Sequence, residues 1–293
     1  MRHKAGHFVA FCLLAAAAAT AVVAQTSPVM ATGTNSPSRQ LLDDHWVADL
    51  GAFIVQSNVR ANLNGTVTGV DNNTQQIDFD KVFGTNASKT RWRFDLLWRI
   101  TPTQHVRFMY FTNDVANTRN TGNLQWGDYT FSGSVRAETK LDVYEGLYEY
   151  AFWRGRDYEV VGDVGVHFDQ VKASLSGNAT LTNPDGSQTV VNGATKSASV
   201  PAPLPVIGLR GDWVLTDNLM FDASGQIFGV SYNGINGSWT DIRAGLTWMF
   251  SDHFGVGLAY DRFYTHVKLD KNDFNGRLAF GYQGALLYIR GGW

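Results

Sequence analysis

Apolar and polar residues alternate with a period of two over much of the chain after residue 45. The clearest stretch is 88–101, where apolar residues take turns with ionic ones. One set comprises Trp92, Phe94, Leu96, Trp98 and Ile100, and the other comprises Arg91, Arg93, Asp95 and Arg99. Successive side chains on a β-strand point to opposite faces, whereas a helix would scatter these arginines around its circumference. The stretch therefore predicts a strand with one apolar and one ionic face.

The same alternation predicts an all-β chain of about ten strands, with eight or twelve as alternatives. It returns in segments 45–60, 103–113, 140–153, 156–172, 204–216, 218–232, 238–250 and 253–269. Arg262 falls on the apolar face of its segment, which predicts that it snorkels or that a bulge shifts the register. In the last strand Leu287 and Ile289 fit the apolar face, but Phe280 and Tyr282 fit the opposite face better. That mismatch predicts a kink near the glycines of this strand.

Short and long connections take turns along the chain. The short ones lie near 101–103, 153–156, 216–218 and 250–253, and the longest polar ones lie at 61–87, 114–134 and 173–198. Membrane β-barrels have short turns on one side and longer loops on the other, with apolar side chains facing lipid and polar ones facing the lumen. The chain is therefore expected to form one closed, antiparallel, up-and-down transmembrane barrel.

Aromatic residues gather beside the short connections. They are Trp98, Trp153, Tyr158, Trp213, Trp248, Phe250 and Phe254. Amphipathic rings are favoured at membrane interfaces. We expect these residues to form an aromatic girdle at the periplasmic side of the membrane.

The start of the chain is typical of a secretory signal peptide. Residues 1–24 combine a charged start, an alanine-rich apolar run and small residues before a cleavage site near Ala24. Residues 25–44 are rich in Ser, Thr, Asn and Pro and are expected to be a flexible periplasmic lead-in to a barrel at 45–293. The one cysteine, Cys12, lies in the leader, so residues 25–293 offer no disulfide, zinc–thiolate cluster or cysteine nucleophile.

The lumen face of the expected barrel is rich in charge of both signs. Its members are Arg91, Arg93, Asp95, Arg99, Arg107, Glu145, Glu149, Glu159, Asp163, Arg210, Asp212, Asp222, Asp241, Arg243 and Asp261. Such a lining would suit a path for ions or solutes. A narrow barrel, however, has room for little beyond its own side chains, and buried charges must be paired to be tolerated. A paired network that fills the lumen is the favoured interpretation.

Catalysis, cofactors and metal binding are not expected. His167 with Asp169 and Asp163 is the strongest constellation of this kind, followed by His266 with Asp270, but an alternating strand produces such pairs by chance. The formal net charge of -2 argues against a nucleic-acid partner. The segment 77–84 looks more ordered than its surroundings, and it could cap the barrel mouth or form a surface hairpin.

The chain ends in Trp293, with Ile289 and Leu287 at alternate positions before it. In this respect it resembles bacterial outer-membrane β-barrel proteins, most nearly the small OmpA/OmpW-type barrels, whose last strand commonly ends in an aromatic residue. The resemblance implies a Gram-negative cell outer membrane, contact with its lipid and lipopolysaccharide, and recognition of Trp293 by the barrel insertion machinery. It implies a structural or narrow-channel role, with a barrel enzyme (protease or lipid hydrolase) or a solute-selective porin as the alternatives. No ligand is indicated.

Overall fold

The computed structural model describes residues 36–65, 77–78, 82–84, 88–232, 235–271 and 274–293. The expected signal peptide and most of the expected lead-in lie outside these residues. No helix in the described part of the chain is long and apolar enough to cross a membrane.

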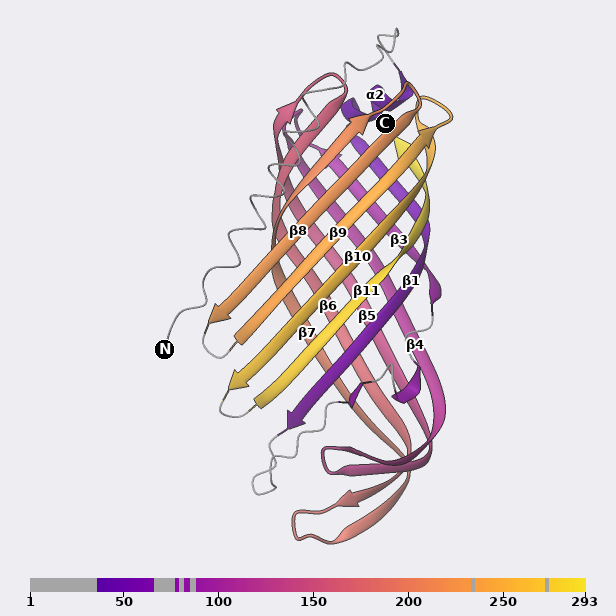
Figure 1. Cartoon of the computed structure of the whole chain (residues 1–293), viewed down its shortest axis with the longest axis vertical. Coiled ribbons are helices and arrows are strands. Elements are labelled where there is room, and N and C mark those ends of the chain that lie inside the picture. The colour runs from indigo at the N-terminus through magenta and orange to yellow at the C-terminus, as the bar shows by residue number, and fades with distance from the viewer. Residues whose placement is uncertain (1–35, 66–76, 79–81, 85–87, 233–234, 272–273) are drawn as a thin grey trace. The chain divides into compact units, whose positions relative to one another are not determined.

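Ten long antiparallel strands form a closed barrel, as the sequence predicts (Figure 1). They are β1 (Trp46–Gly65), β3 (Lys89–Arg99), β4 (Gln104–Trp126), β5 (Tyr129–Arg154), β6 (Tyr158–Thr182), β7 (Gln188–Val214), β8 (Leu219–Tyr232), β9 (Ile235–Met249), β10 (Phe254–Lys271) and β11 (Phe274–Gly292). Each pairs with the next in chain order, and β11 pairs with β1 to close the sheet. A short additional strand, β2 (Ile77–Asp78), pairs with β1. The all-β, up-and-down barrel is thus confirmed.

The two-residue rhythm of the sequence separates the two faces of the barrel. Trp92 is 73% exposed on the outside, whereas its neighbour Arg93 is only 5% exposed. The same contrast holds on β9, where Leu246 and Trp248 are exposed while Arg243 and Thr247 are buried. The outside is therefore apolar and the lumen holds most of the ionic side chains, as expected for a barrel in lipid.

The short connections are the turns expected from the sequence, but two of the long ones differ from expectation. Segments 114–134 and 173–198 lie almost wholly within the paired strands of the β4–β5 and β6–β7 hairpins. Asn183 to Ser187 forms the tip of the second hairpin, with Gly186 at a φ of 80°. The expectation of loops was wrong because a strand needs an apolar outer face only where it meets lipid. Outside the membrane the same strands continue to pair through their backbones, although their outer side chains are mostly polar.

The last strand is regular. The pairing of β11 with both β10 and β1 runs without a register shift, so the expected kink is absent. Leu287 and Ile289 are exposed, while Phe280 and Tyr282 are buried. Both halves of the strand therefore obey one alternation. The sequence suggested two registers because large apolar residues in the first half of this strand face the lumen instead of the lipid. Arg262 is likewise exposed on the outside, and the ladders of β10 show no bulge beside it.

A short helix, α2 (Pro37–Asp43), lies within the segment expected to be a flexible lead-in. Ser36 caps it by accepting a hydrogen bond from the backbone N–H of Arg39, and Pro37 takes the first helical position, where its missing N–H costs nothing. Leu41 and Leu42 are buried against Val47, Leu97, Met220 and Met249. The helix therefore packs at the end of the barrel that carries the short turns (Figure 1).

Candidate functional site

A layer of paired charges crosses the lumen. We call it the charge layer and define it by its buried or half-buried members Asp49, Arg93, Asp95, Arg99, Arg107, Glu149, Glu159, Arg210, Asp212, Asp222, Arg243, Asp261 and Arg290. Six are arginines and seven are carboxylates, so the two signs nearly balance. Sequence reasoning found most of this set but missed Asp49 and Arg290. The alternation in the first and last strands also places these two residues on the lumen face, but the charged residues of those strands were not included in the predicted network.

One half of the charge layer is centred on Asp95. Arg93 donates to both oxygens of Asp95, from Nε at 2.9 Å and from Nη2 at 3.0 Å, and it also donates to Asp261. Arg243 donates to Asp95 Oδ1 at 3.1 Å. These residues come from β3, β9 and β10, so the contacts tie distant walls of the barrel together.

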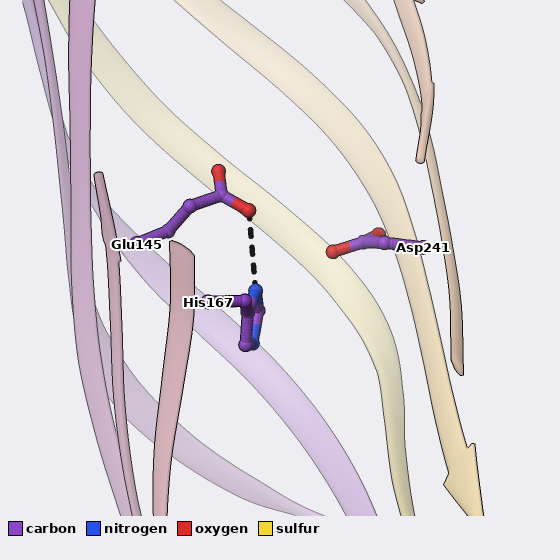
Figure 2. Close-up of side chains that lie close together, drawn as sticks. All are labelled: Glu145, His167 and Asp241. Carbon is purple, nitrogen blue, oxygen red and sulfur yellow. Dashed lines mark hydrogen bonds and ion pairs between the residues drawn. The ribbon is translucent and has the colours of Figure 1, made fainter. Parts of the chain in front are cut away.

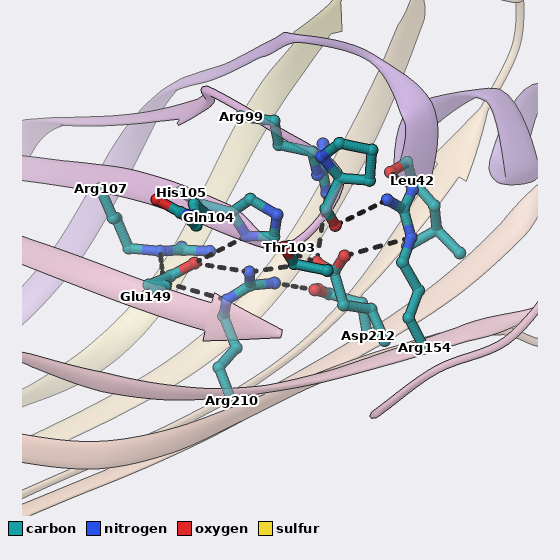
Figure 3. A network of polar contacts seen from close by, with 12 residues as sticks. Leu42, Arg99, Thr103, Gln104, His105, Arg107, Glu149, Arg154, Arg210 and Asp212 are labelled. Carbon is teal, nitrogen blue, oxygen red and sulfur yellow. Dashed lines mark hydrogen bonds and ion pairs between the residues drawn. The ribbon is translucent and has the colours of Figure 1, made fainter. Parts of the chain in front are cut away.

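The other half is centred on Glu149 (Figure 3). Arg107 Nε and Arg210 Nη2 each donate to Glu149 at 2.7 Å, and Arg210 also pairs with Asp212. Glu159 lies within 3.7 Å of Arg99 Nη2 and 3.5 Å of Arg210 Nη2. Arg210 thus faces three carboxylates, while Arg99 and Arg107 each pair with one. Such pairing offsets the desolvation of buried ions.

Arg91, Asp163, Glu145 and Asp241 do not join the charge layer, although the sequence grouped them with it. Arg91 pairs with Asp114, with 3.0 Å between Nη2 and Oδ1, and it is not buried. Glu145 and Asp241 lie near His167, whereas Asp163 is the direct partner of Glu149 in the β5–β6 ladder and forms no ion pair with an arginine among the described residues. All three acids line a small cavity that they share with members of the charge layer.

Helix α2 closes the short-turn end of the lumen. Arg39 pairs with Asp157 in the β5–β6 turn and, at 3.2 Å, with Asp217 in the β7–β8 turn. From the barrel wall, Arg99 donates to the carbonyl oxygens of Leu41 at 3.0 Å and Asp44 at 2.9 Å. These contacts satisfy two of the carbonyls at the C-terminal end of the helix, which have no partner within it. Burial raises the pKa of the Asp44 carboxyl above its ordinary value, since the nearby charges of His253 and Arg99 only partly offset the loss of water.

Aromatic rings fill the lumen on the other side of the charge layer. This aromatic layer consists of Phe53, Phe111, Trp239, Phe263, Phe280 and Tyr282. Phe111 meets Tyr282 edge-on at 4.8 Å between centroids, and Phe263 stacks on Tyr282 at 5.0 Å. The sequence did not predict this layer, because inward aromatic residues look the same as lipid-facing ones until the register is known.

Within the segment 77–84, the described residues 82–84 contribute to the same filling. Phe83 is fully buried and packs in the cluster that contains the aromatic layer, and Asn117 Nδ2 donates to its carbonyl oxygen at 2.7 Å. Of the two expectations for this segment, the capping one agrees with this placement.

Two small cavities lie between the side chains of the lumen. They have volumes of about 20 and 30 Å³ and lie among the residues of the charge layer. Each has room for about one or two water molecules. Among the described residues the layers and α2 thus leave water-sized gaps between the side chains.

The strongest catalytic constellation expected from the sequence lies deep in the lumen. His167 is fully buried, with Nδ1 3.1 Å from Glu145 Oε2 and Nε2 3.2 Å from Asp169 Oδ1. His266, in contrast, is exposed on the outside of β10, and the side chain of Asp270 lies outside the described residues. The residue that the sequence missed beside His167 is Glu145, its direct partner on the neighbouring strand.

The girdle residues all lie outside the barrel beside the short turns. Trp98, Trp153, Trp248, Phe250 and Phe254 are exposed, and Tyr158 and Trp213 are half-buried against other rings. A second group of outward rings, Tyr110, Tyr144 and Phe168, lies farther along the same strands, with 4.8 Å between the Tyr110 and Tyr144 centroids. Two aromatic belts on one wall are typical of membrane barrels.

Comparison with known proteins identifies a fold but no protein family for this chain. No family model and no curated protein matches the chain. Among solved structures, the outer membrane protease OmpT from Escherichia coli aligns with a TM-score of 0.54 at 9% identity, over 85% of this chain and 96% of that one. OprG from Pseudomonas aeruginosa aligns with a TM-score of 0.34 at 11% identity, over 84% of this chain and 96% of that one. The chain therefore has the fold of bacterial outer-membrane β-barrel proteins.

Proposed function

We propose that this protein is a structural barrel of the outer membrane whose lumen does not conduct. The observation that carries the proposal is the filling of the lumen by α2, the charge layer and the aromatic layer. A channel needs a continuous water-filled path lined by polar groups. Here the arginines and carboxylates that could line such a path pair with one another instead.

The two aromatic belts support a position across a bilayer. From Tyr158 to Phe168, β6 rises about 25 Å along the barrel axis, at about 3.3 Å per residue and a tilt of about 40°. This matches the apolar band of about 25 Å in outer-membrane barrels. We propose that the short turns and α2 face the periplasm, that the outside contacts membrane lipid and lipopolysaccharide, and that Trp293 is read by the insertion machinery.

The β4–β5 and β6–β7 hairpins would be the part of such a barrel that contacts other molecules. The β4–β5 and β6–β7 hairpins continue well past the outer belt, β6 from Phe168 to Thr182. In Figure 1 they extend away from the end that carries α2. A rigid, filled barrel would hold them outside the cell, where they could contact other surfaces.

We propose that the protein is not an enzyme. A hydrolase in the outer rim needs a nucleophile or an activated water that substrate can reach. The best histidine–carboxylate group, His167 with Glu145 and Asp169, is buried among lumen side chains. This placement supports the non-catalytic role over the protease and lipid-hydrolase alternatives.

Conductance in planar bilayers tests the proposal. The purified protein, shown to be folded by heat-modifiable gel migration, should give no conductance steps under conditions in which a porin gives them. Steady, ion-selective steps from the wild-type protein would contradict a sealed lumen. Replacing residues 179–191 by an Asn-Gly turn would shorten the β6–β7 hairpin, and it should leave heat-modifiable migration unchanged if the barrel folds independently of the hairpin.

A further inference from the structure

Three acidic side chains gather around His167. They are Glu145, Asp169 and Asp241, and all are buried. The arginines nearest to them already face the carboxylates of the charge layer, as Arg93 does with Asp95 and Asp261. Among the described residues, Glu145 and Asp169 each lie within about 3.2 Å of a ring nitrogen of His167. A bound cation would add positive charge to this group of acids.

His167 and two of the acids converge from three strands (Figure 2). Glu145 lies on β5, His167 on β6 and Asp241 on β9, and one potential ligand atom from each lies within 4.8 Å of the others. Glu145 and His167 are direct partners across the ladder. Figure 2 shows the carboxylate of Asp241 pointing toward both. Binding of one metal ion to all three atoms would draw them closer together, because metal–ligand distances are about 2 Å.

Asp241 supplies the observation that points to a ligand. Its side chain is only 8% exposed, and its Oδ1 accepts no hydrogen bond from any described residue. A buried carboxylate without a partner is costly. Asp241 and Glu145 also line the cavity of about 30 Å³, which can hold water molecules beside them. The aimed carboxylate and the adjoining space are the surroundings that an ion with water ligands requires.

The two ring nitrogens of His167 have different neighbours. Nδ1 faces Glu145 Oε2 at 3.1 Å, inside the cluster, while Nε2 lies 3.2 Å from Asp169 Oδ1. Metal-binding histidines usually present one nitrogen to the ion and the other to a carboxylate, which fixes the tautomer. Phe263 stacks on the ring with 4.7 Å between centroids and holds its orientation. Asp169 therefore stands where an orienting carboxylate would stand.

We propose that Glu145, His167 and Asp241 form a binding site for one divalent transition-metal ion of the zinc class inside the barrel. One imidazole nitrogen and two carboxylate oxygens are ligands that Zn²⁺ accepts, and water from the cavity completes its coordination. Such an ion would link β5, β6 and β9 and neutralise the acids around it. Asp169 is the positioning residue of the site.

Metal binding to the refolded protein tests the proposal. The chain is refolded in detergent with Zn²⁺ or Co²⁺ present, since the site is buried, and freed of excess metal. The wild type should retain one ion per chain, and the Co²⁺ form should show the visible d–d bands of a site with nitrogen and oxygen ligands. Asp241→Asn and Glu145→Gln should each weaken Zn²⁺ affinity by at least about tenfold.

Asp142→Asn is the matched control, because Asp142 lies on β5 beside Glu145 but pairs with Lys140 outside the cluster. It should bind Zn²⁺ as the wild type does. A folded wild type that retains no ion, or a folded Asp241→Asn that binds as tightly as wild type, would overturn the site. If both cluster variants fail to fold, the Co²⁺ spectrum of the wild type decides, and the absence of the d–d bands counts against the proposal.

Discussion

Arg290 and Asp49 form a two-pronged ion pair across the seam where the last strand meets the first. Arg290 Nε and Nη2 each donate to Asp49 at 2.7 Å, and the two residues are direct partners in the β11–β1 ladder. Both side chains are buried. The barrel is therefore closed by a charged pair as well as by backbone hydrogen bonds.

Removing one member of this pair should destabilise the barrel strongly. Arg290→Met leaves Asp49 buried with Arg243 as its remaining ion-pair partner among the described residues, at 3.7 Å, and we expect a loss of about 3–5 kcal/mol in the free energy of unfolding. The double variant Asp49→Leu with Arg290→Met should lose less than the single one, because the Asp49 carboxylate is no longer buried without its two-pronged partner; the weaker contact of Arg290 with Asp222, at 3.7 Å, is lost in both. Urea unfolding in lipid vesicles measures all three. Lys140→Met, at an exposed pair, is the control and should cost no more than about 1 kcal/mol.

The α2 plug should contribute to stability through its leucines. Leu41 is 1% exposed in the cluster with Met220 and Met249. Leu41→Ala should cost about 2–5 kcal/mol, since it leaves a cavity in a packed region. Val190→Ala, on the outer hairpin where the side chain is 73% exposed, should cost little. Equal effects of the two substitutions in urea unfolding would show that α2 does not pack as described.

Asp44 should make stability depend on pH. Its pKa in the folded chain is raised by burial above the ordinary value of 3.8, so folding disfavours the charged carboxylate. Asp44→Asn should therefore stabilise the protein at pH 7. The advantage should shrink as the pH falls through the raised pKa and vanish below about 3.8, where the carboxyl is protonated in both states. Thermal unfolding of both proteins at pH 7 and pH 3.5 measures this, and a difference that persists at the lower pH would refute the assignment.

A charge on the lipid face should be costly between the belts but not beyond them. Val164 is 56% exposed on β6, between Tyr158 and Phe168. Val164→Arg should cost about 2–4 kcal/mol in a bilayer, as expected for arginine near the midplane. Val190→Arg should have little effect because that site lies in the outer hairpin. If Val164→Arg were as mild in vesicles as Val190→Arg, the membrane would not lie where the belts place it.

The fold could be read from the sequence because lipid imposes a simple rule on each strand. Trp92 and Arg93 show it directly, with one residue outside and the next inside. Lipid does not restrict the side chains that face the lumen, and both a charged residue, Arg290, and an aromatic one, Phe280, lie there. The aromatic layer therefore escaped prediction, and so did α2, whose seven residues are too few to show a helical period.

The candidate site was only partly accessible from the sequence for a related reason. His167 and Asp169 are neighbours on one strand and were noticed together. Glu145 and Asp241 lie on other strands, and only the register brings them to His167. Pairing between strands is set by turn lengths and closure, which no single segment encodes.

The backbone bonds between Trp46 and Trp293 have a consequence for how the barrel assembles. Each residue donates its N–H to the carbonyl oxygen of the other at 3.0 Å, although nearly the whole chain separates them. Bringing such distant segments together carries a large loop-closure entropy, so this contact belongs late in the order of folding. Until it forms, β1 and β11 both offer unpaired edges that can pair with other chains. A chain without its final strand would be an open sheet prone to aggregate, and not a smaller barrel.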